Sequence, residues 1–360
     1  MDGTAIVLTS GTLFSHRAKT THGLIRGTSR YKILGVIAKE QAGQDAGQAL
    51  DGVHRNIPVY ASVADFVRQN PQKADFCLIG VASKGGILPA ELKPLVREAI
   101  QTGMSMVNGL HEFLSDMEDM RTLAEENNVK LIDIRKPRPK HLLKFWSEKI
   151  KEVPCMRLAV LGTDCNLGKR TTTKFLTDAL KQEGFRAEMI YTGQTGWMQG
   201  SEYGFIFDST YNDFISGEIE NALVCCWEEA KPDIMLIEGQ SALRNPSGPG
   251  GSEFLVSGQV KYVILQHAPA RKYFEGFSVE IPSLESEVEL IRLYGSEVIG
   301  ITLNTTGLTK EEAFSYKHQY QETLKIPVVL PIEEGIQDLL PGIKKLMSQH
   351  SYSRDTHGLP

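Results

Sequence analysis

The sequence has few cysteines, no long apolar run and no excess of positive charge, and each shortage excludes a class of protein. Five cysteines, at positions 77, 155, 165, 225 and 226, are too few and too irregularly spaced for a disulfide framework or a zinc site. No apolar run reaches the roughly 18 residues of a membrane span. A net charge of -5 gives no reason to expect a nucleic-acid partner. We therefore expect a cytoplasmic protein that binds neither membrane nor nucleic acid.

Other signals are missing as well. The opening residues, M-D-G-T-A-I-V-L, lack the basic segment of a signal peptide, so we do not expect export. There is no G-x-G-x-x-G, which argues against a dinucleotide-binding fold of the usual kind. No internal repeat or low-complexity tract occurs. The 360 residues, 41% of them hydrophobic and 23% charged, have the composition of an ordinary globular protein with room for two domains.

The first half of the chain alternates short apolar runs with helical patterns, such as those at 62–69 and 89–102. This alternation predicts a Rossmann-like α/β domain with a mostly parallel sheet over residues 1–136. Glycines after the fourth run, at 80, 85 and 86, either line a ligand cleft or serve tight turns. The predicted strands are 5–8, 33–38, 58–60, 76–81, 105–107 and 130–134.

Residues 157–173, R-L-A-V-L-G-T-D-C-N-L-G-K-R-T-T-T, contain the most informative pattern in the chain. An apolar strand at 158–161 leads into a loop between Gly162 and Gly168, and a helix follows to about residue 181. Glycines let backbone N–H groups turn toward anionic oxygens, while Lys169 and the helix N-terminus favour the same charge. The pattern predicts a phosphate-binding loop (P-loop); the alternative is a polar turn with a chance Gly-Lys pair.

The loop departs from the standard G-x-x-x-x-G-K-[ST] in two ways. Five residues lie between its glycines where the standard pattern has four. Arg170 occupies the position of the hydroxyl that would bind magnesium, and Thr171 comes next. We therefore expect good phosphate binding and less certain metal binding.

The second half continues the α/β pattern, which predicts a P-loop domain over 153–347. A segment rich in proline and cations at 133–140 indicates a linker. The linker and a bridging helix at about 141–151 together span 137–152. The polar tail, 348–360, is expected to fray. The predicted strands are 187–191, 205–207, 232–237, 260–266, 298–303 and 326–329, with a helix at 218–230.

Polar side chains follow several of these strands. Glu238 ends an apolar strand in the same domain as the phosphate loop, where it could order water or a metal or, alternatively, cap the next turn. His267 ends another strand and is followed by Arg271 and Lys272, a combination suited to holding a carboxylate and moving a proton. In the first half, His111 follows a strand, and a structural role for it stays open.

The chain resembles known proteins at two levels. The second half is similar to dethiobiotin synthetase in three features. These are the G-T-D-x-x-x-G-K loop (162–169), an E-G pair at the end of one strand (238–239) and an L-N pair at the end of another (303–304). Nearly the whole chain resembles a bacterial P-loop family of unknown function whose members are described as D-glutamate, or more broadly D-amino-acid, N-acetyltransferases. The matching stretches are V-N-G-L-H-E-F-L-S-D (107–116), D-I-R-K-P (133–137), G-T-D-C-N-L-G-K-R-T-T (162–172), T-G-Q-T-G (192–196), D-F-I-S-G (213–217), I-E-G-Q (237–240) and L-Q-H-A-P-x-R (265–271).

This resemblance implies acetyl transfer from acetyl-CoA to a D-amino acid, most simply D-glutamate, in D-amino-acid catabolism. The loop would hold the phosphates of coenzyme A, and a base would remove a proton from the substrate ammonium. We also expect a homo-oligomer. The candidates are Gly162, Thr163, Asn166, Gly168, Lys169, Arg170 and Thr171 for coenzyme A; Glu238, Asp213 or His267 for the base; Asn304 or Gln240 near the oxyanion; Arg271 and Arg244 as carboxylate clamps; and Gln194, Asn108, His111 and Arg17 as further substrate-binding residues.

Two other functions remain open at this point. One is an ATP- and magnesium-dependent ligase or kinase of the dethiobiotin synthetase type, which Lys169, Thr171 and Glu238 favour and Arg170 disfavours. The other is a nucleotide-binding regulatory protein. If the protein is an acetyltransferase, as the family resemblance implies, no metal site is predicted.

Overall fold

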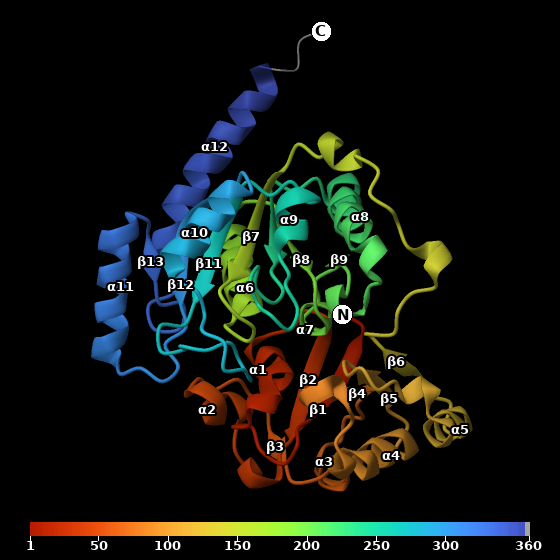
Figure 1. Ribbon diagram of the computed structural model, residues 1–360. Coiled ribbons are helices and arrows are strands. Elements are labelled where there is room, and N and C mark those ends of the chain that lie inside the picture. The colour runs from red at the N-terminus through yellow and green to blue at the C-terminus, as the bar shows by residue number, and fades with distance from the viewer. Residues whose placement is uncertain (357–360) are drawn as a thin grey trace. The chain divides into compact units, whose positions relative to one another are not determined.

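The structure is a computed structural model that describes residues 1–356 (Figure 1). Its internal contacts divide the chain into two units. The N-terminal unit comprises Met1–Pro137 and Gln194–Gly200, and the C-terminal unit comprises Arg138–Gly193 and the chain from Ser201 onward. The segment 194–200 therefore groups with the N-terminal unit, although the sequence interpretation has a continuous second domain over 153–347.

The N-terminal unit is built on a parallel sheet of six strands in the order β3-β2-β1-β4-β5-β6. This is the strand order of a doubly wound Rossmann fold, in which β1 and β4 meet at the point where the order reverses. Its strands are β1 (Gly3–Leu8), β2 (Tyr31–Ile37), β3 (Val59–Tyr60), β4 (Phe76–Ile79), β5 (Ser105–Asn108) and β6 (Leu131–Asp133), and its helices are α1 (Lys19–Arg26), α2 (Ala46–Asp51), α3 (Val63–Gln69), α4 (Lys93–Gln101), α5 (Glu118–Glu126) and α7 (Gln194–Met198).

The C-terminal unit contains a seven-stranded sheet in the order β13-β12-β11-β7-β10-β8-β9, and every pair in it is parallel. Strand β7 is central and has β11 and β10 as neighbours. The strands are β7 (Met156–Gly162), β8 (Ala187–Tyr191), β9 (Tyr203–Gly204), β10 (Ile234–Glu238), β11 (Tyr262–His267), β12 (Glu297–Leu303) and β13 (Val328–Val329), and the helices are α6 (Lys169–Gln182), α8 (Asn212–Ala230), α9 (Ser252–Val256), α10 (Leu284–Leu293), α11 (Lys310–Leu324) and α12 (Leu340–Thr356).

Burial explains why the apolar runs were visible in the sequence. All five residues of β10 are buried, and β7 is buried except at Arg157. Parallel strands covered by helices on both faces need such continuous apolar runs. Two hydrophobic clusters, one on each face of the sheet, contain alternate residues of β7 such as Ala159 and Val160. The predicted fold class, two parallel-sheet α/β domains with the P-loop in the second, is confirmed.

The predicted bridging helix at 141–151 is wrong. Only two short 3₁₀ turns form there, Lys140–Leu142 and Lys149–Glu152. Buried carboxylates on α8 take the backbone N–H groups that a helix would use: Glu218 accepts from Lys144 (2.9 Å), and Glu220 accepts from Ser147 (2.6 Å) and Ile150 (3.1 Å). Glu218 also forms an ion pair with Arg138. The segment is therefore fastened to α8 as an irregular strap.

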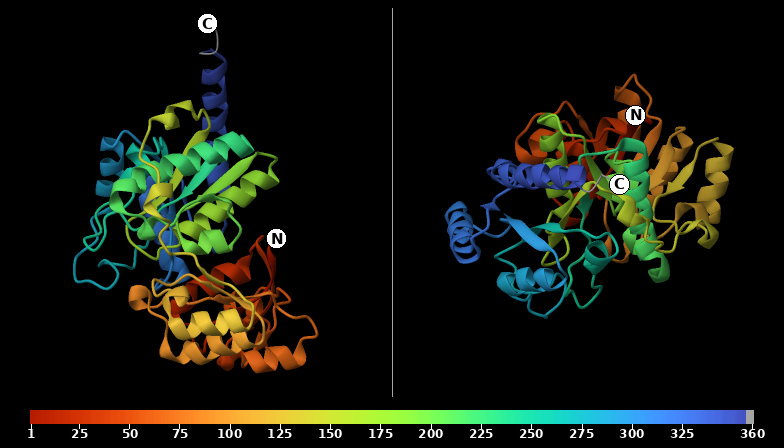
Figure 2. Two further views of the ribbon diagram at one scale, coloured as in Figure 1. Left: turned by 90° about the vertical axis from the view of Figure 1, so that its right-hand side faces the viewer. Right: turned by 90° about the horizontal axis from the view of Figure 1, so that it is seen from above.

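Two smaller predictions also differ from the structure. The expected strand 205–207 is replaced by β9 and a 3₁₀ turn at Phe207–Ser209. The tail does not fray at 348, because α12 continues to Thr356 and His350 bonds the Pro154 carbonyl (2.7 Å). Figures 1 and 2 show α12, in dark blue, extending away from the sheet of its unit; the rest of the predicted tail, 357–360, lies outside the described residues.

Within residues 1–356, no helix combines the length and apolar character needed to cross a bilayer. All five cysteines are free thiols.

Candidate phosphate-binding and acid–base site

The phosphate loop joins β7 to α6 in the C-terminal unit. It leaves the sheet at Thr163, whose N–H donates to the Gln266 carbonyl (3.0 Å). The backbone then turns through left-handed conformations at Asn166 (φ +55°) and Gly168 (φ +105°). Gly162 is required for a different reason, since a Cβ there would lie 3.0 Å from Cδ of Lys169. These glycines let the loop curl back over the start of α6.

Lys169 is directed into the loop and is only 7% exposed. Its ammonium donates to the carbonyls of Asp164 (2.7 Å) and Ser241 (2.8 Å). Within residues 1–356, the N–H groups of Leu167, Gly168 and Thr171 have no protein acceptor. A buried cation beside such N–H groups at a helix N-terminus fits an anionic ligand such as a phosphate group.

The hydroxyls after Arg170 are mostly committed to protein acceptors. Thr172 donates to Oε1 of Gln266 (2.6 Å), and Thr173 donates to the Lys169 carbonyl (2.8 Å). Because Arg170 occupies the usual hydroxyl position, Thr171 is the hydroxyl left near that place. The loop is thus better suited to phosphate oxygens than to the standard magnesium arrangement.

Asp164 organises the loop, and the sequence reasoning missed it. Its side chain is completely buried. One oxygen accepts from Cys165 N–H (2.7 Å) and Nδ2 of Asn245 (3.0 Å), and the other accepts from Nη1 of Arg271 and the N–H of Glu275, each at 2.8 Å. The sequence did offer one signal for Asp164, because it is the carboxylate between the two glycines of the loop. Four donors from three segments indicate a structural anchor.

Arg271, predicted as a carboxylate clamp, is held by protein groups. Besides Asp164, it contacts Glu275 (3.2 Å) and donates to the Cys165 carbonyl (2.7 Å). Arg244, the second predicted clamp, forms an ion pair with buried Glu287 (2.6 Å). Each of the two guanidinium groups is therefore paired with a carboxylate of the protein and holds a loop in place.

Glu238 lies at the end of β10, next to β7, and is 5% exposed. Burial raises the pKa of its carboxyl, while Arg170, the Thr192 amide, Lys169 and the Gly193 amide act in the opposite direction. The Thr192 N–H donates to Oε2 (3.1 Å). A carboxyl with a raised pKa beside the cations of the phosphate loop has the properties of a general base.

Gln240 and Gly193 lie beside Glu238. Nε2 of Gln240 donates to the Thr192 hydroxyl (3.0 Å). A Cβ on Gly193 would lie 3.2 Å from that Nε2 and 3.6 Å from Oε1 of Glu238. The missing side chain therefore leaves space in front of the carboxyl and the amide.

His267 is buried at the end of β11. Its Nδ1 lies 2.9 Å from the Thr163 hydroxyl, and its Nε2 lies 3.3 Å from the Tyr320 hydroxyl. Burial lowers the pKa of His267 to about 4, with Glu285 acting in the opposite direction. The imidazole is therefore neutral at pH 7, and both nitrogens have hydroxyl partners. This arrangement favours a positioning role for His267 over a role as the base.

The remaining candidates of the C-terminal unit, Asn304 and Asp213, lie in different environments. Asn304 donates to the Leu167 carbonyl (2.9 Å) and accepts from the Thr306 N–H (3.0 Å), so it braces the phosphate loop. Asp213 is exposed in the first turn of α8, where its negative charge interacts favourably with the helix dipole. Of the three predicted bases, Glu238 has the environment that suits the task best.

Four substrate-binding candidates belong to the N-terminal unit. Asn108 is buried and donates to Asp133 (2.7 Å) and to the Glu112 carbonyl (2.8 Å), so protein groups fix the orientation of its amide. His111 and Gln194 are brought together by Arg135, which lies 2.7 Å from each. Arg17 is exposed after β1. A role in substrate binding stays a prediction for all four residues.

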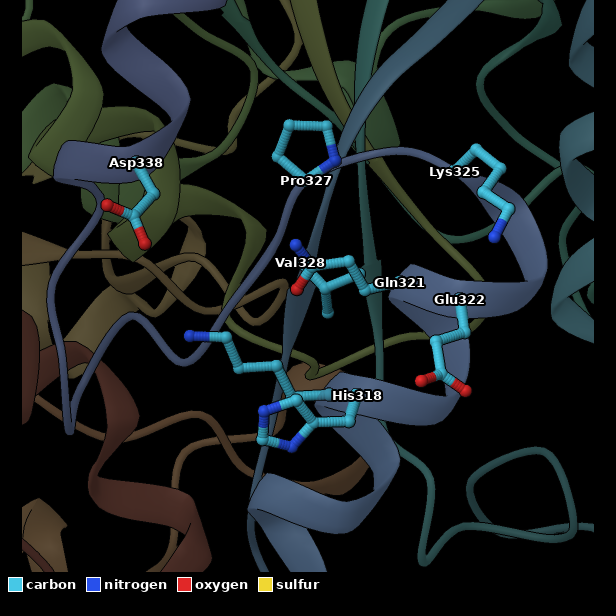
Figure 3. Close-up of a pocket in the computed structure, with 8 residues that line it drawn as sticks. His318, Gln321, Glu322, Lys325, Pro327, Val328 and Asp338 are labelled. Carbon is cyan, nitrogen blue, oxygen red and sulfur yellow. The ribbon is translucent and has the colours of Figure 1, made fainter.

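A surface cavity of about 500 Å³ lies elsewhere in the C-terminal unit, beside α11 and β13 (Figure 3). None of the residues predicted from the sequence line it. Its walls mix cations and carboxylates: Lys317, His318, Gln321, Glu322, Lys325, Pro327, Val328 and Asp338.

Comparisons with known proteins agree with this architecture. Residues 144–340 match the P-loop domain of the DUF1611 family, and residues 39–137 match its Rossmann-like N-terminal domain; both are described as domains of unknown function. A crystal structure of a DUF1611 family protein from Anabaena variabilis superposes with a TM-score of 0.83 at 27% identity, covering 94% of this chain and 98% of that one.

Two curated relatives carry a functional name. A "D-glutamate N-acetyltransferase" from a Pseudoalteromonas species is 31% identical over 274 residues, and one of the same name from Tritonibacter scottomollicae is 30% identical over 275 residues. Each match covers 74% of this chain and 80% of the relative. The chain belongs to the DUF1611 family.

Proposed function

We propose that this protein transfers an acetyl group from acetyl-CoA to the amino group of a D-amino acid, most simply D-glutamate. The observation that carries the proposal is the place of Glu238: a buried carboxyl with a raised pKa, at the end of the strand next to the phosphate loop. The names of the two curated relatives support the reaction and the substrate.

The residues of the loop fit the phosphates of coenzyme A. The N–H groups of Leu167, Gly168 and Thr171 and the Lys169 ammonium would hold a pyrophosphate or a ribose phosphate. Arg170 adds a guanidinium that can form a fork with phosphate oxygens. Coenzyme A, when bound, would supply the acetyl group as a thioester. We also propose that this reaction belongs to D-amino-acid catabolism.

Glu238 supplies the step that the chemistry requires of the protein. An amino acid arrives as an ammonium ion, which has no lone pair for attack. The Glu238 carboxylate takes one proton from that ammonium, and burial makes it a stronger base than an exposed carboxylate. Gln240, whose Nε2 lies beside Gly193 and donates one N–H to the Thr192 hydroxyl, would donate its second N–H to the developing oxyanion.

The test is mass spectrometry of D- and L-amino-acid panels incubated with acetyl-CoA. We expect N-acetylation of D-glutamate, a loss of about 10² to 10⁴-fold in kcat for Glu238→Gln, and a raised KM for acetyl-CoA in Lys169→Ala. The matched control is Glu228→Gln, which changes an exposed carboxylate on α8. No acetylated product from any amino acid would refute the proposal, and Asp213→Asn inactive with Glu238→Gln active would reassign the base.

A second candidate is an ATP- and magnesium-dependent ligase or kinase, since Lys169 and Glu238 also suit a nucleotide triphosphate. Thermal shift separates the two, because a ligand that binds only the folded state raises its stability. Stabilisation by coenzyme A without magnesium favours acetyl transfer, and stabilisation by ATP only with magnesium favours the alternative. Stabilisation by nucleotide with no turnover of any substrate favours a regulatory protein.

A further inference from the structure

A short hairpin, residues 272–281, follows β11 in the C-terminal unit. Its two arms pair through Phe274 N–H to the Val279 carbonyl and Ile281 N–H to the Lys272 carbonyl, each at 2.9 Å. A bridge between Tyr273 and Glu280 joins the same arms. These contacts give the hairpin a defined backbone.

The hairpin is fastened to the phosphate loop. The N–H of Glu275, inside the hairpin, donates to Asp164 (2.8 Å), and Arg271, just before it, donates to Asp164 and to the Cys165 carbonyl. Asp164 is completely buried, so this attachment is shielded from water. A group bound by the loop therefore has the hairpin as a neighbour.

The hairpin exposes three of its large apolar side chains. Phe274 is 2% exposed and packs inward, whereas Phe277 and Val279 are each 49% exposed and Tyr273 is 42% exposed. The Lys272 ammonium lies 5.3 Å from the centroid of the Tyr273 ring, so a cation flanks one aromatic. Two exposed aromatic rings beside an anion-binding loop suit a ligand with a flat ring close to its phosphates.

We propose that the hairpin clamps the purine base of the acyl donor by stacking it against Tyr273 or Phe277. This inference rests on the proposed function. In coenzyme A the adenine is joined to the pyrophosphate through one ribose, so a pyrophosphate in the loop brings the base near the hairpin. The acetyl end of the donor is left for Glu238, and the hairpin then selects nucleotide-bearing donors over donors that consist of pantetheine alone.

The experiment measures binding by calorimetry to the full chain. The probes are acetyl-CoA, ADP and S-acetylpantetheine, which lacks the nucleotide. We expect the combined Tyr273→Ala and Phe277→Ala variant to bind acetyl-CoA and ADP about 5- to 150-fold more weakly, with S-acetylpantetheine unchanged. Tyr294→Ala is the matched control, because Tyr294 is also 42% exposed and directly follows α10; the affinities of this variant should equal those of the wild type.

The outcomes separate the clamp from the proposed function. Wild-type affinity for acetyl-CoA and ADP in the double variant overturns the clamp, whether or not the protein acetylates an amino acid. An equal loss for S-acetylpantetheine also overturns it, since that donor has no base to stack. A wild type that acetylates nothing, with ADP affinity lost only in the hairpin variant, refutes acetyl transfer and supports the clamp.

Discussion

At the scale of single residues, Glu238 combines a functional advantage with a cost in stability. Its carboxyl is buried, so ionisation is less favourable in the folded chain than in the unfolded chain. The same burial makes the carboxylate a better proton acceptor near neutral pH. Catalysis and stability should therefore respond to Glu238 in opposite directions.

This opposition predicts the pH dependence of Glu238→Gln. In the wild type, the raised pKa of Glu238 stabilises the folded state fully below its ordinary value of 4.5, and that contribution is lost as the pH rises through the folded-state pKa. The glutamine amide of the variant does not titrate, so the stability of the variant relative to the wild type should rise with pH. Urea denaturation between pH 4 and pH 8 measures the difference, and parallel curves would contradict the assignment.

His267 predicts the reverse dependence. Its pKa is lowered from 6.5 to about 4, so the unfolded chain binds a proton that the folded chain does not. The wild type should lose up to about 3 kcal/mol of stability as the pH falls from 6.5 to about 4. His267→Gln should show a shallower loss over that interval. His318→Gln, which removes an exposed imidazole, is the matched control.

Residue types at strand ends could be predicted from the sequence, but their partners could not. Gly162, Gly168 and Lys169 form a local pattern, and the structure builds them into one loop. Asp164 was not recognised, because its donors Asn245 and Arg271 are 81 and 107 residues away. The same kind of long-range bond holds Arg271, the predicted clamp, against Asp164.

At the scale of elements, the strap at 138–152 shows how distant carboxylates override a local helix pattern. Glu218 and Glu220 are 2% and 3% exposed and accept backbone N–H groups from the strap. The pattern of apolar residues in the strap carries no information about these acceptors, which lie about 70 positions later. The strands, in contrast, were predictable, because burial on both faces gives them continuous apolar runs.

The strap should detach when Glu220 is removed. We expect Glu220→Ala to cost about 3 kcal/mol in the free energy of unfolding, because it leaves the N–H groups of Ser147 and Ile150 without their acceptor. Chymotrypsin should then cleave faster at Phe145 and Trp146, which are already 65% and 40% exposed. Glu220→Gln keeps one oxygen acceptor and should cost less. A wild-type cleavage rate in Glu220→Ala would contradict this account.

At the scale of the whole molecule, α7 is the feature that a linear domain division does not predict. Gln199 donates through Nε2 to the carbonyls of Gly23 (2.8 Å) and Gly27 (3.0 Å), which lie at the end of α1. The Arg30 guanidinium lies 4.3 Å from the ring centroid of Trp197. The segment 194–200 therefore completes the fold of the N-terminal unit, although residues 138–193 separate the two in sequence.

Gln199→Ala should destabilise the N-terminal unit by about 2 kcal/mol, since the buried carbonyl of Gly23 and the half-buried carbonyl of Gly27 each lose a donor. Of the three tryptophans, at positions 146, 197 and 227, only Trp197 belongs to that unit. Fluorescence of a Trp146→Phe, Trp227→Phe background therefore reports on it alone. An unchanged unfolding midpoint in this background would show that Gln199 contributes nothing to the stability of that unit.

The placement of 194–200 also determines how the gene can be divided. The chain passes between the two units at 137/138, 193/194 and 200/201, so no single break yields two complete halves. A fragment that stops after Pro137 lacks the donor to Gly23 and Gly27, and the complementary fragment carries α7 without the surface that α7 covers. Protein engineers who wish to exchange either half with a homologue must graft this seven-residue piece together with residues 1–137.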